Sequence, residues 1–187
     1  MLSGLVQTRY GTSVSAEADA VSGFPVLRIP NVVTGEIDIS HLKYVALPRA
    51  DIERLLLKYG DVLVVRSNGN PDYVGRSAPV TDIHTKTPHV YASYLIRLRV
   101  DIERLLPEYL SSYLNSPYGR AAMRNAIRTT AGQSNLSGES LSRVKIPLPS
   151  IEQQRFFTRV WNSLQELRVL VNNAEELGRE LVSAMRG

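Results

Sequence analysis

The chain has 187 residues, of which 43% are hydrophobic and 21% are charged, and it contains no cysteine. This size and composition predict one folded domain with room for an appended element. The lack of cysteine excludes a disulfide scaffold, a thiolate nucleophile and a cysteine-ligated zinc site. Because no run of about 18 apolar residues and no secretory signal is present, we expect a cytoplasmic protein without membrane contact.

The formal net charge of +4 is concentrated in the middle of the chain. Residues 61–150 hold 11 Lys and Arg against 7 Asp and Glu, whereas the segments before and after are balanced. A polyanionic partner is therefore expected to meet this middle segment.

Short strands are predicted in the first hundred residues. The runs 24–29 and 61–66 are rich in strand-forming residues and are bounded by Gly, Pro and Asn. Apolar residues occupy every second position from Val90 to Val100. This alternation predicts one strand whose even-numbered residues face the core. The opposite face of that strand would end in Arg97 and Arg99.

The hexapeptide DIERLL occurs at 51–56 and again at 101–106. The similarity around it stops soon afterwards, whereas a duplicated domain would continue into the next element. We interpret both copies as one local structure used twice, a helical turn with Asp51 or Asp101 as its N-cap and leucines facing inward. Neither copy has the character of a catalytic site.

Two helices are predicted next. The first covers 107–115 with Pro107 in its first turn, and the second begins after the cap Ser116 and ends at Gly132. The second helix would carry a basic stripe on one face, either a solvated surface or a phosphate contact. This stripe consists of Arg120, Arg124 and Arg128.

The clearest periodic signal lies at the end of the chain. After a polar loop and an extended segment, Ser150 and Gln153 have the spacing of a capping box. From 151 to 186, apolar residues recur in steps of three and four, as in a coiled coil. Such a helix is about 50 Å long, so we expect a second chain to cover it; the alternative is a helix lying along its own domain. The predicted seam consists of Phe157, Val160, Leu164, Leu167, Val171, Ala174, Leu181 and Met185.

Little in the sequence points to catalysis. The three histidines lack metal-ligand spacing, and no P-loop, Gly-rich dinucleotide loop or nucleophile elbow occurs. The tetrapeptide NSPY at 115–118 is similar to the Asn-Pro-Pro-Tyr loop with which amino-methyltransferases hold a flipped base. Its second residue is Ser116, however, and no methyl-donor pocket accompanies it. We predict no catalytic residue, no metal and no cofactor in this chain.

The loop 66–76 is the best functional candidate. It follows a predicted strand and offers the side-chain types that pair with base edges or with phosphate, although Asn, Gly and Pro are also ordinary turn formers.

Taken together, these segments resemble the specificity subunits of type I restriction-modification systems. The similar stretches follow the family's order and cover almost the entire chain; they are RYGTSVSA, FPVLRIPNVVTGEIDIS, LLKYGDVLVVRSNGNPDYVGR and GQSNLSGESLSRVKIPLPSIEQQ. Members of that family have two target-recognition domains, each followed by a long helix, and the two helices pack antiparallel as a spacer. This chain has one domain and one helix. The resemblance therefore implies a half-length subunit, or half of a longer one, that pairs with itself.

The resemblance implies an α+β fold. We expect a target-recognition domain over 1–149, with a short-stranded twisted sheet and packed helices, followed by one long coiled-coil helix over 150–187. The implied partners are double-stranded DNA, a second copy of the chain, modification subunits that carry the methyl donor, and through them a restriction subunit. Each chain would read one half-site of a gapped palindrome without making or breaking a bond. The expected DNA contacts are Arg9, Tyr10, Thr12, Arg66, Asn68, Asn70, Tyr73, Arg76, Lys86, Arg120, Arg124 and Arg128.

Two other functions stay open at this point. The chain could be a coiled-coil scaffold with an incidental basic surface, which salt-dependent duplex binding would distinguish. It could also be a fragment of an amino-methyltransferase, which binding of the methyl donor would reveal.

Overall fold

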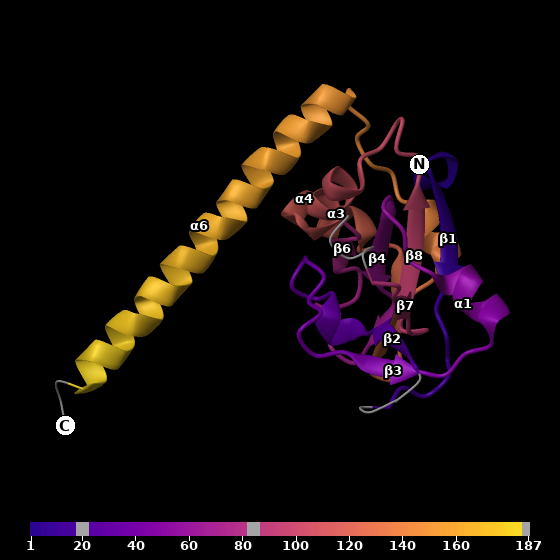
Figure 1. Cartoon of the computed structure of the whole chain (residues 1–187). Coiled ribbons are helices and arrows are strands. Elements are labelled where there is room, and N and C mark those ends of the chain that lie inside the picture. Colours follow the sequence, from indigo (N-terminus) through magenta and orange to yellow (C-terminus); the bar gives the residue numbers. More distant parts are fainter. Residues whose placement is uncertain (18–22, 82–86, 185–187) are drawn as a thin grey trace.

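A computed structural model describes residues 1–17, 23–81 and 87–184, which form an α+β domain and one long helix that projects from it (Figure 1). The expected α+β class is confirmed, whereas the coiled-coil character of the long helix stays a prediction. The described sheets are three rather than one. The largest has the strand order β1-β8-β4-β6, formed by Val6–Tyr10, Leu95–Val100, Asp61–Val65 and Ser77–Pro79, with every neighbouring pair antiparallel.

Two smaller sheets complete the described β structure. One has the order β3-β2-β7, formed by Lys43–Val45, Phe24–Leu27 and Val90–Tyr91; the other has the order β5-β10-β9, formed by Ser67–Asn68, Gln133–Leu136 and Ile127–Thr130. The helices are η1 Leu2–Gly4, η2 Ile29–Asn31, α1 Arg49–Leu55, α3 Pro107–Asn115, α4 Pro117–Met123, α5 Gly138–Ser142 and α6 Ile151–Ala184.

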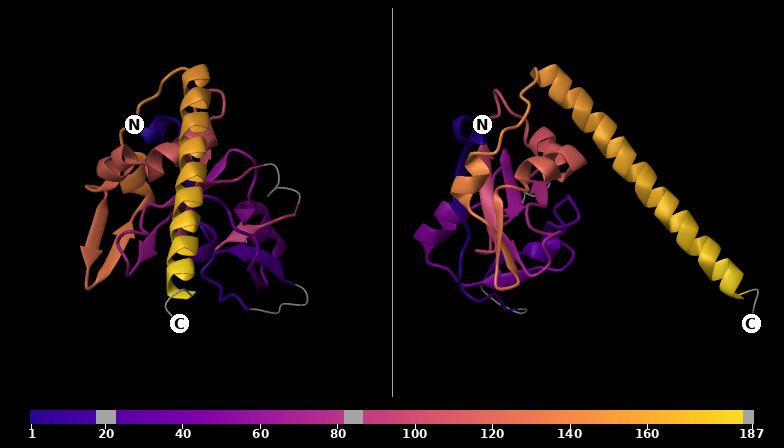
Figure 2. Two further views of the ribbon diagram at one scale, coloured as in Figure 1. Left: turned by 90° about the vertical axis from the view of Figure 1, so that its left-hand side faces the viewer. Right: turned by 180° about the vertical axis from the view of Figure 1, so that it is seen from behind.

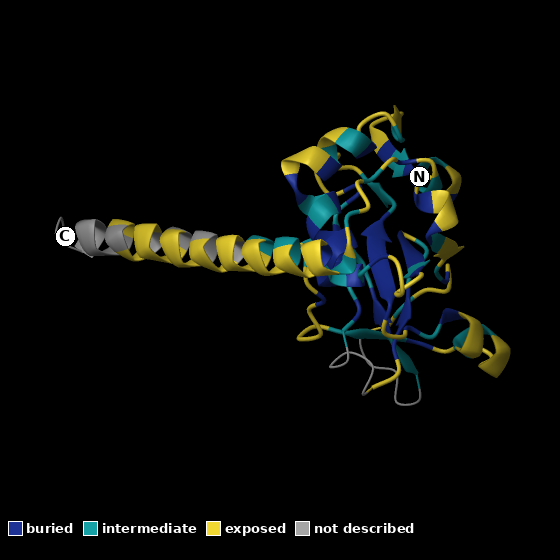
Figure 3. Cartoon of the chain, turned by 90° about the horizontal axis from the view of Figure 1, so that it is seen from above, coloured by how far each residue is buried: buried dark blue, intermediate teal, exposed yellow. Residues whose placement is uncertain are grey.

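The four-stranded sheet carries a hydrophobic core on each face, which explains why its central strands are buried almost throughout (Figure 3). Residues such as Val62 and Ile96 pack with α3 on one face. Leu63 and Leu95 pack on the other face with the small sheet that contains β2. A strand buried on both faces reads as a continuous apolar run, as DVLVV does.

The prediction of a single strand over 90–100 is wrong. It is divided into β7 and β8 by a turn, in which the Ser93 N–H donates to Thr12 O at 2.7 Å. Tyr94, expected in the core, is 58% exposed, whereas Leu95 and Arg97 on the opposite face are buried. The alternation is misleading because both faces of β8 contact a core.

The basic end of β8 faces a buried carboxylate rather than solvent. Arg99 makes two hydrogen bonds of 2.8 Å to Asp61, and the Arg97 Nε lies 3.8 Å from the same carboxylate. Burial lowers the pKa of Arg97, while the hydrogen bonds that Arg99 donates to Asp61 raise the pKa of Arg99. Arg97 is therefore part of the interior, and Arg99, which is one-third exposed, is held to it by the same carboxylate.

The two DIERLL copies adopt different structures. The first lies in α1, whose N-cap is Pro48, so Asp51 stands in the first turn and is not the cap. The second is a hydrogen-bonded turn in which Asp101 O accepts the N–H groups of Arg104 and Leu105. Pro107 explains the difference, since a proline disfavours helical conformation in the residue before it.

The helix predictions after residue 106 are confirmed at their starts. α3 has the predicted bounds, and the Ser116 hydroxyl caps α4 by accepting the Gly119 N–H at 3.2 Å. α4 ends at Met123, however, and not at Gly132. The prediction that Arg120, Arg124 and Arg128 form a basic stripe on one helix is therefore wrong, because residues 127–130 form β9.

A hairpin replaces the rest of the predicted helix and part of the predicted polar loop. β-branched residues in β9 favour a strand, and Ala131 and Gly132 have φ of 49° and 76°, which closes a tight turn onto β10. The predicted loop thus contains β10 and α5. The predicted capping box at α6 is present, with the Ser150 N–H donating to Gln153 Oε1 at 3.1 Å and the Gln153 N–H to Ser150 Oγ at 3.3 Å.

α6 contacts its own domain only near its start and then diverges from it (Figure 2). The domain boundary between residues 149 and 150 stays a prediction.

Candidate nucleic-acid interface

Two predicted contact segments meet at one end of the four-stranded sheet. The register pairs Tyr10, near the end of β1, with Ile96, which in turn pairs with Val64 near the end of β4. The chain continues from these strand ends into residues 11–12 and into the loop 66–76. Segments more than fifty residues apart in sequence are thus adjacent.

Side chains tie these segments together. The Arg66 guanidinium lies over the Tyr10 ring, 4.7 Å from its centroid, and donates to Ser93 O at 3.4 Å. The Tyr10 hydroxyl accepts the Gly138 N–H at 2.8 Å, which connects the same site to the start of α5. Tyr10 is still 44% exposed, so part of its ring is available to a ligand.

The loop 66–76 is held by its own side chains. Asn68 Oδ1 accepts the Asn70 N–H at 2.8 Å, and Asn70 Oδ1 accepts the Asp72 N–H at 3.0 Å. Within the described structure, no acceptor binds the amide nitrogens of Asn68 and Asn70, so both can donate to a ligand. Tyr73 is 41% exposed beside them.

Arg120 braces this loop from α4. It donates to Val74 O at 2.7 Å and to Asp72 O at 3.2 Å. Burial, together with the charge of Arg76, lowers its pKa. Arg76 itself is partly exposed, and its Nε donates to Asp72 O at 3.4 Å. The two guanidinium groups therefore form one basic cluster at the base of the loop.

The remaining predicted contacts are distributed differently. Arg9 and Arg128 are exposed on β1 and β9, and Arg124 is exposed at the end of α4, with no recorded contact to the loop. Thr12 is only 9% exposed, and its hydroxyl accepts the Val14 N–H at 3.1 Å, so it shapes the backbone. Lys86 lies outside the described residues.

The β9–β10 hairpin was missed in the sequence. It projects from the domain, and β10 pairs with β5 of the candidate loop, Asn135 opposite Ser67 (Figure 2). A hydrogen bond of 2.8 Å between Thr129 and Ser134 joins its strands. The signal for it was the Ala-Gly pair after a β-branched run. Its exposed residues include Arg128, Thr130 and Gln133.

Apart from Arg28, the domain's arginines divide into two groups. In the described parts of the chain, the arginines that pair with carboxylates are Arg49, Arg54, Arg97, Arg99, Arg104 and Arg143. None of the six arginines predicted to contact DNA is among them. Their charge is not compensated by a carboxylate partner, which leaves it available to phosphate.

The NSPY tetrapeptide has a structural role. Asn115 Nδ2 donates to Ser77 O at 2.7 Å, and its Oδ1 accepts the Ser77 N–H at 3.1 Å, so the side chain completes the edge of β6. Ser116 is the cap of α4. No group of His, Asp and Glu suitable for a metal ion is found among the described residues. No described helix is long and apolar enough to cross a membrane.

α6 carries an apolar band that its own domain does not cover. Five predicted seam residues are exposed, namely Val160, Leu164, Leu167, Val171 and Ala174. Three further exposed apolar residues were missed, namely Phe156, Leu170 and Leu177. Phe157 instead faces the domain, with its ring edge-on to Tyr109 at 5.2 Å. The Leu181 side chain and Met185 are outside the description.

Comparisons with known proteins agree on one family, although no family model matches the chain. The chain is 32% identical over 158 residues to the Type I restriction enzyme EcoKI specificity subunit of Escherichia coli K12, covering 83% of this chain and 33% of that protein. It is 26% identical over 172 residues to the putative type I restriction enzyme MjaX specificity subunit of Methanocaldococcus jannaschii, covering 90% of this chain and 39% of that protein.

Solved structures show the same fold. A chain of a type I R-M system aligns with a TM-score of 0.66 and 18% identity, over 92% of this chain and 39% of that one. The HsdS subunit of Thermoanaerobacter tengcongensis aligns with a TM-score of 0.59 and 18% identity, over 94% of this chain and 43% of that one. The chain spans about a third of the length of its curated relatives, and it belongs to the family of type I restriction enzyme specificity subunits.

Proposed function

We propose that this chain recognises one half-site of duplex DNA for a type I restriction-modification methyltransferase and endonuclease. The observation that carries the proposal is the convergence at one end of the sheet. Tyr10, Arg66 and the loop 66–76 meet there with the β5–β10 pairing. Arg76 and Arg120, which have no carboxylate partner among the described residues, lie at the base of that loop.

The chemistry of this surface suits two kinds of contact. Exposed arginines such as Arg9 and Arg128 supply the sequence-independent attraction to phosphates. Asparagine amides in the loop, and the polar side chains of the hairpin, match the donors and acceptors on base edges in the grooves. A two-stranded ribbon is narrow enough to enter the major groove.

Pairing of two chains through α6 completes the proposal. A band of exposed Val and Leu along a free helix is stabilised when a second apolar helix covers it. Two identical chains related by a two-fold axis would read a palindrome, and the helices would set the gap between its halves. The chain itself would catalyse no reaction and hold no cofactor. Modification subunits in the cytoplasm would carry the methyl donor and flip the target adenine out of the duplex, and a restriction subunit would join through them.

The test is binding of the full chain to a random-sequence duplex library across a salt series. The logarithm of the affinity should fall linearly with the logarithm of the salt concentration. The bound duplexes should be enriched in a two-part sequence with a fixed gap. Absence of affinity even at low salt would leave the scaffold function in its place. Sequencing the methylated sites of the host with and without this chain is the cellular counterpart, and a lost gapped motif is the expected result.

A further inference from the structure

The first turns of α6 are locked onto the domain by one buried glutamine. Gln154 is 0% exposed. Its Oε1 accepts the Leu106 N–H at 2.9 Å, while its Nε2 donates to Arg104 O at 2.9 Å and to Pro149 O at 3.0 Å. A buried amide with three bonds to main-chain atoms of two segments fixes both segments in one geometry, because any rotation of the helix leaves buried groups unpaired.

An aromatic contact one turn further on is the second point of attachment. Phe157 packs edge-on against Tyr109 of α3, whose hydroxyl donates to Pro147 O at 3.2 Å. From Val160 onward the exposed seam residues begin, and the helix leaves the domain (Figure 2). The attachment is therefore confined to the base of a long lever, and within it the hydrogen bonds of Gln154 are directional whereas the ring contact is not.

Because α6 is long, a small change in its angle to the domain displaces its far end by a large distance. A tilt of about 10° at the base of a helix about 50 Å long moves its far end by about 9 Å. One base-pair step is about 3.4 Å along the duplex. A change of that size is therefore equivalent to between two and three base pairs.

We infer that Gln154 is a positioning residue that fixes the angle between α6 and the reading domain, and through that angle the gap between two half-sites. The part about the gap rests on the proposed function. The part about the angle does not, because it depends only on contacts within one chain. Gln154 touches no DNA in this arrangement, so it should affect spacing and leave the preferred half-site unchanged.

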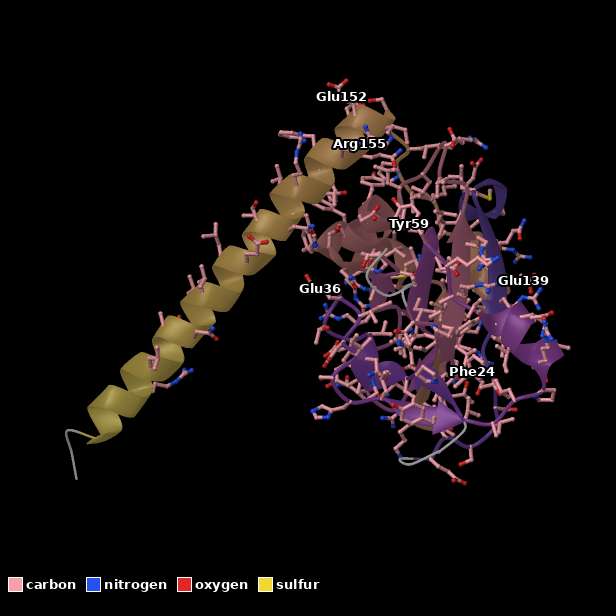
Figure 4. All side chains as sticks on the ribbon, in the orientation of Figure 1. Phe24, Glu36, Tyr59, Glu139, Glu152 and Arg155 are labelled. Atoms are coloured by element: carbon pink, nitrogen blue, oxygen red, sulfur yellow. The ribbon has the colours of Figure 1, made fainter. Side chains whose placement is uncertain are left out.

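The angle is tested by distance measurement between two nitroxide labels. The chain has no cysteine, so Glu36→Cys on the domain and Glu166→Cys on α6, both exposed, accept labels selectively. Figure 4 shows Glu36 on the domain, with Glu152 and Arg155 marking the first turns of α6. An excess of unlabelled chain confines the measurement to distances within one chain.

The variant is Gln154→Met, which keeps the volume and removes the hydrogen bonds, and the matched control is Asn162→Met, at an exposed amide further along α6. The expected result is a narrow distribution in the parent and control, and a shift or broadening of about 4 Å in Gln154→Met, the displacement of residue 166 for a 10° tilt. Should Gln154→Met not fold, Gln154→Asn, which keeps the amide but shortens its reach, takes its place. A distribution identical to that of the parent overturns the inference.

The gap is tested on duplexes that carry the half-sites enriched by the parent, at the preferred gap and at one base pair more or less. The parent and Asn162→Met should bind the altered gaps about tenfold more weakly, and Gln154→Met should lose most of this discrimination while keeping the same half-site. Altered label distances with unchanged gap discrimination refute the spacing role. If the parent binds no DNA, the proposed function and the spacing role fail together, and the label distances still decide the angle.

Discussion

The guanidinium of Arg66 lies over the ring of Tyr10, with 4.7 Å between Cζ and the ring centroid. This contact joins the end of β1 to the loop that follows β4. A cation above a tyrosine face is stabilised by about 0.5–1 kcal/mol at a partly exposed site. The pair therefore holds two segments of the candidate interface together. Substitutions that displace either strand end should alter both the free energy of unfolding and DNA binding.

Gly11 allows the segment after Tyr10 to approach β7 closely. A Cβ at this position would lie 2.2 Å from Tyr91 O and 2.4 Å from Ala92 O, so the two backbones would have to separate. Gly11→Ala should lower the free energy of unfolding by about 1–3 kcal/mol or more and weaken DNA binding. Urea unfolding measures the first effect. Gly4→Ala, outside the candidate interface, is the control, since nothing lies within 4 Å of its Cβ, and an equal loss in both variants contradicts the argument.

Arg128 offers a test of phosphate contact that leaves the fold intact. It is exposed on β9, and no carboxylate pairs with it in the described structure. Arg128→Gln should leave the free energy of unfolding within about 0.5 kcal/mol and reduce the slope of log affinity against log salt by about 1. The control is Arg143→Gln, an exposed arginine already paired with Glu139. If both variants lower the slope equally, the effect is general charge and not a contact of the hairpin.

The sequence predicted the elements whose signals are local. Pro107 and Ser116 mark helix starts by their own conformational preferences, and Ser150 with Gln153 marks the start of α6. The strands predicted at 24–29 and 61–66 correspond to β2 and β4. The family resemblance supplied the α+β class and the DNA-recognition function, which these local patterns alone did not indicate.

What could not be predicted depends on partners distant in sequence. Arg97 and Arg99 look like a solvated face until Asp61 is placed beside them by the pairing of β4 with β8. β10 has no apolar alternation, because it is stabilised by backbone pairing on both sides, with β5 and with β9. The sequence does not show the role of Gln154, since two of its three partners, Arg104 and Leu106, lie 50 and 48 residues away.

Asp61 should be the most sensitive charged residue of the core. Its carboxylate is fully buried and neutralises Arg99, one-third exposed, and the almost fully buried Arg97. Asp61→Asn leaves buried positive charge without a partner, and the expected loss in the free energy of unfolding is about 3–5 kcal/mol. Asp51→Asn, which breaks the exposed pair with Arg54, should cost under about 1 kcal/mol. Similar losses in the two variants, measured by urea unfolding, would show that the buried cluster is not essential.

Tyr91 should make the protein sensitive to alkaline pH. Burial raises its pKa from the ordinary 10.0 to about 12, while the charge of Arg97 acts in the opposite direction. Below pH 10 the hydroxyl is protonated in both states, so its full contribution is present. Between pH 10 and about 12 only the unfolded chain ionises, and the free energy of unfolding falls by about 1.4 kcal/mol per pH unit.

Unfolding curves from pH 9 to 12 would measure this slope in the parent and in Tyr91→Phe. The phenylalanine variant should lose this part of the slope, although it also loses a hydrogen bond of 3.3 Å to Arg9 O. Tyr94→Phe, at a ring that is 58% exposed, is the control and should follow the parent. An unchanged slope in Tyr91→Phe would assign the alkaline sensitivity to other groups.

Leu167 tests whether a second copy covers α6. Its side chain is 58% exposed in the isolated chain, in the middle of the apolar band. Burial of a leucine in a helix pair contributes about 1.5–3 kcal/mol, and a two-fold axis places two such residues in the interface. Leu167→Glu should therefore weaken self-association by a factor of a hundred or more, on the order of 3 kcal/mol, in analytical ultracentrifugation. The unfolding midpoint of the domain should change little, because Leu167 touches none of its core. Glu166→Gln, at an adjacent exposed position, is the control, and a parent chain that is monomeric at high concentration would exclude this pairing.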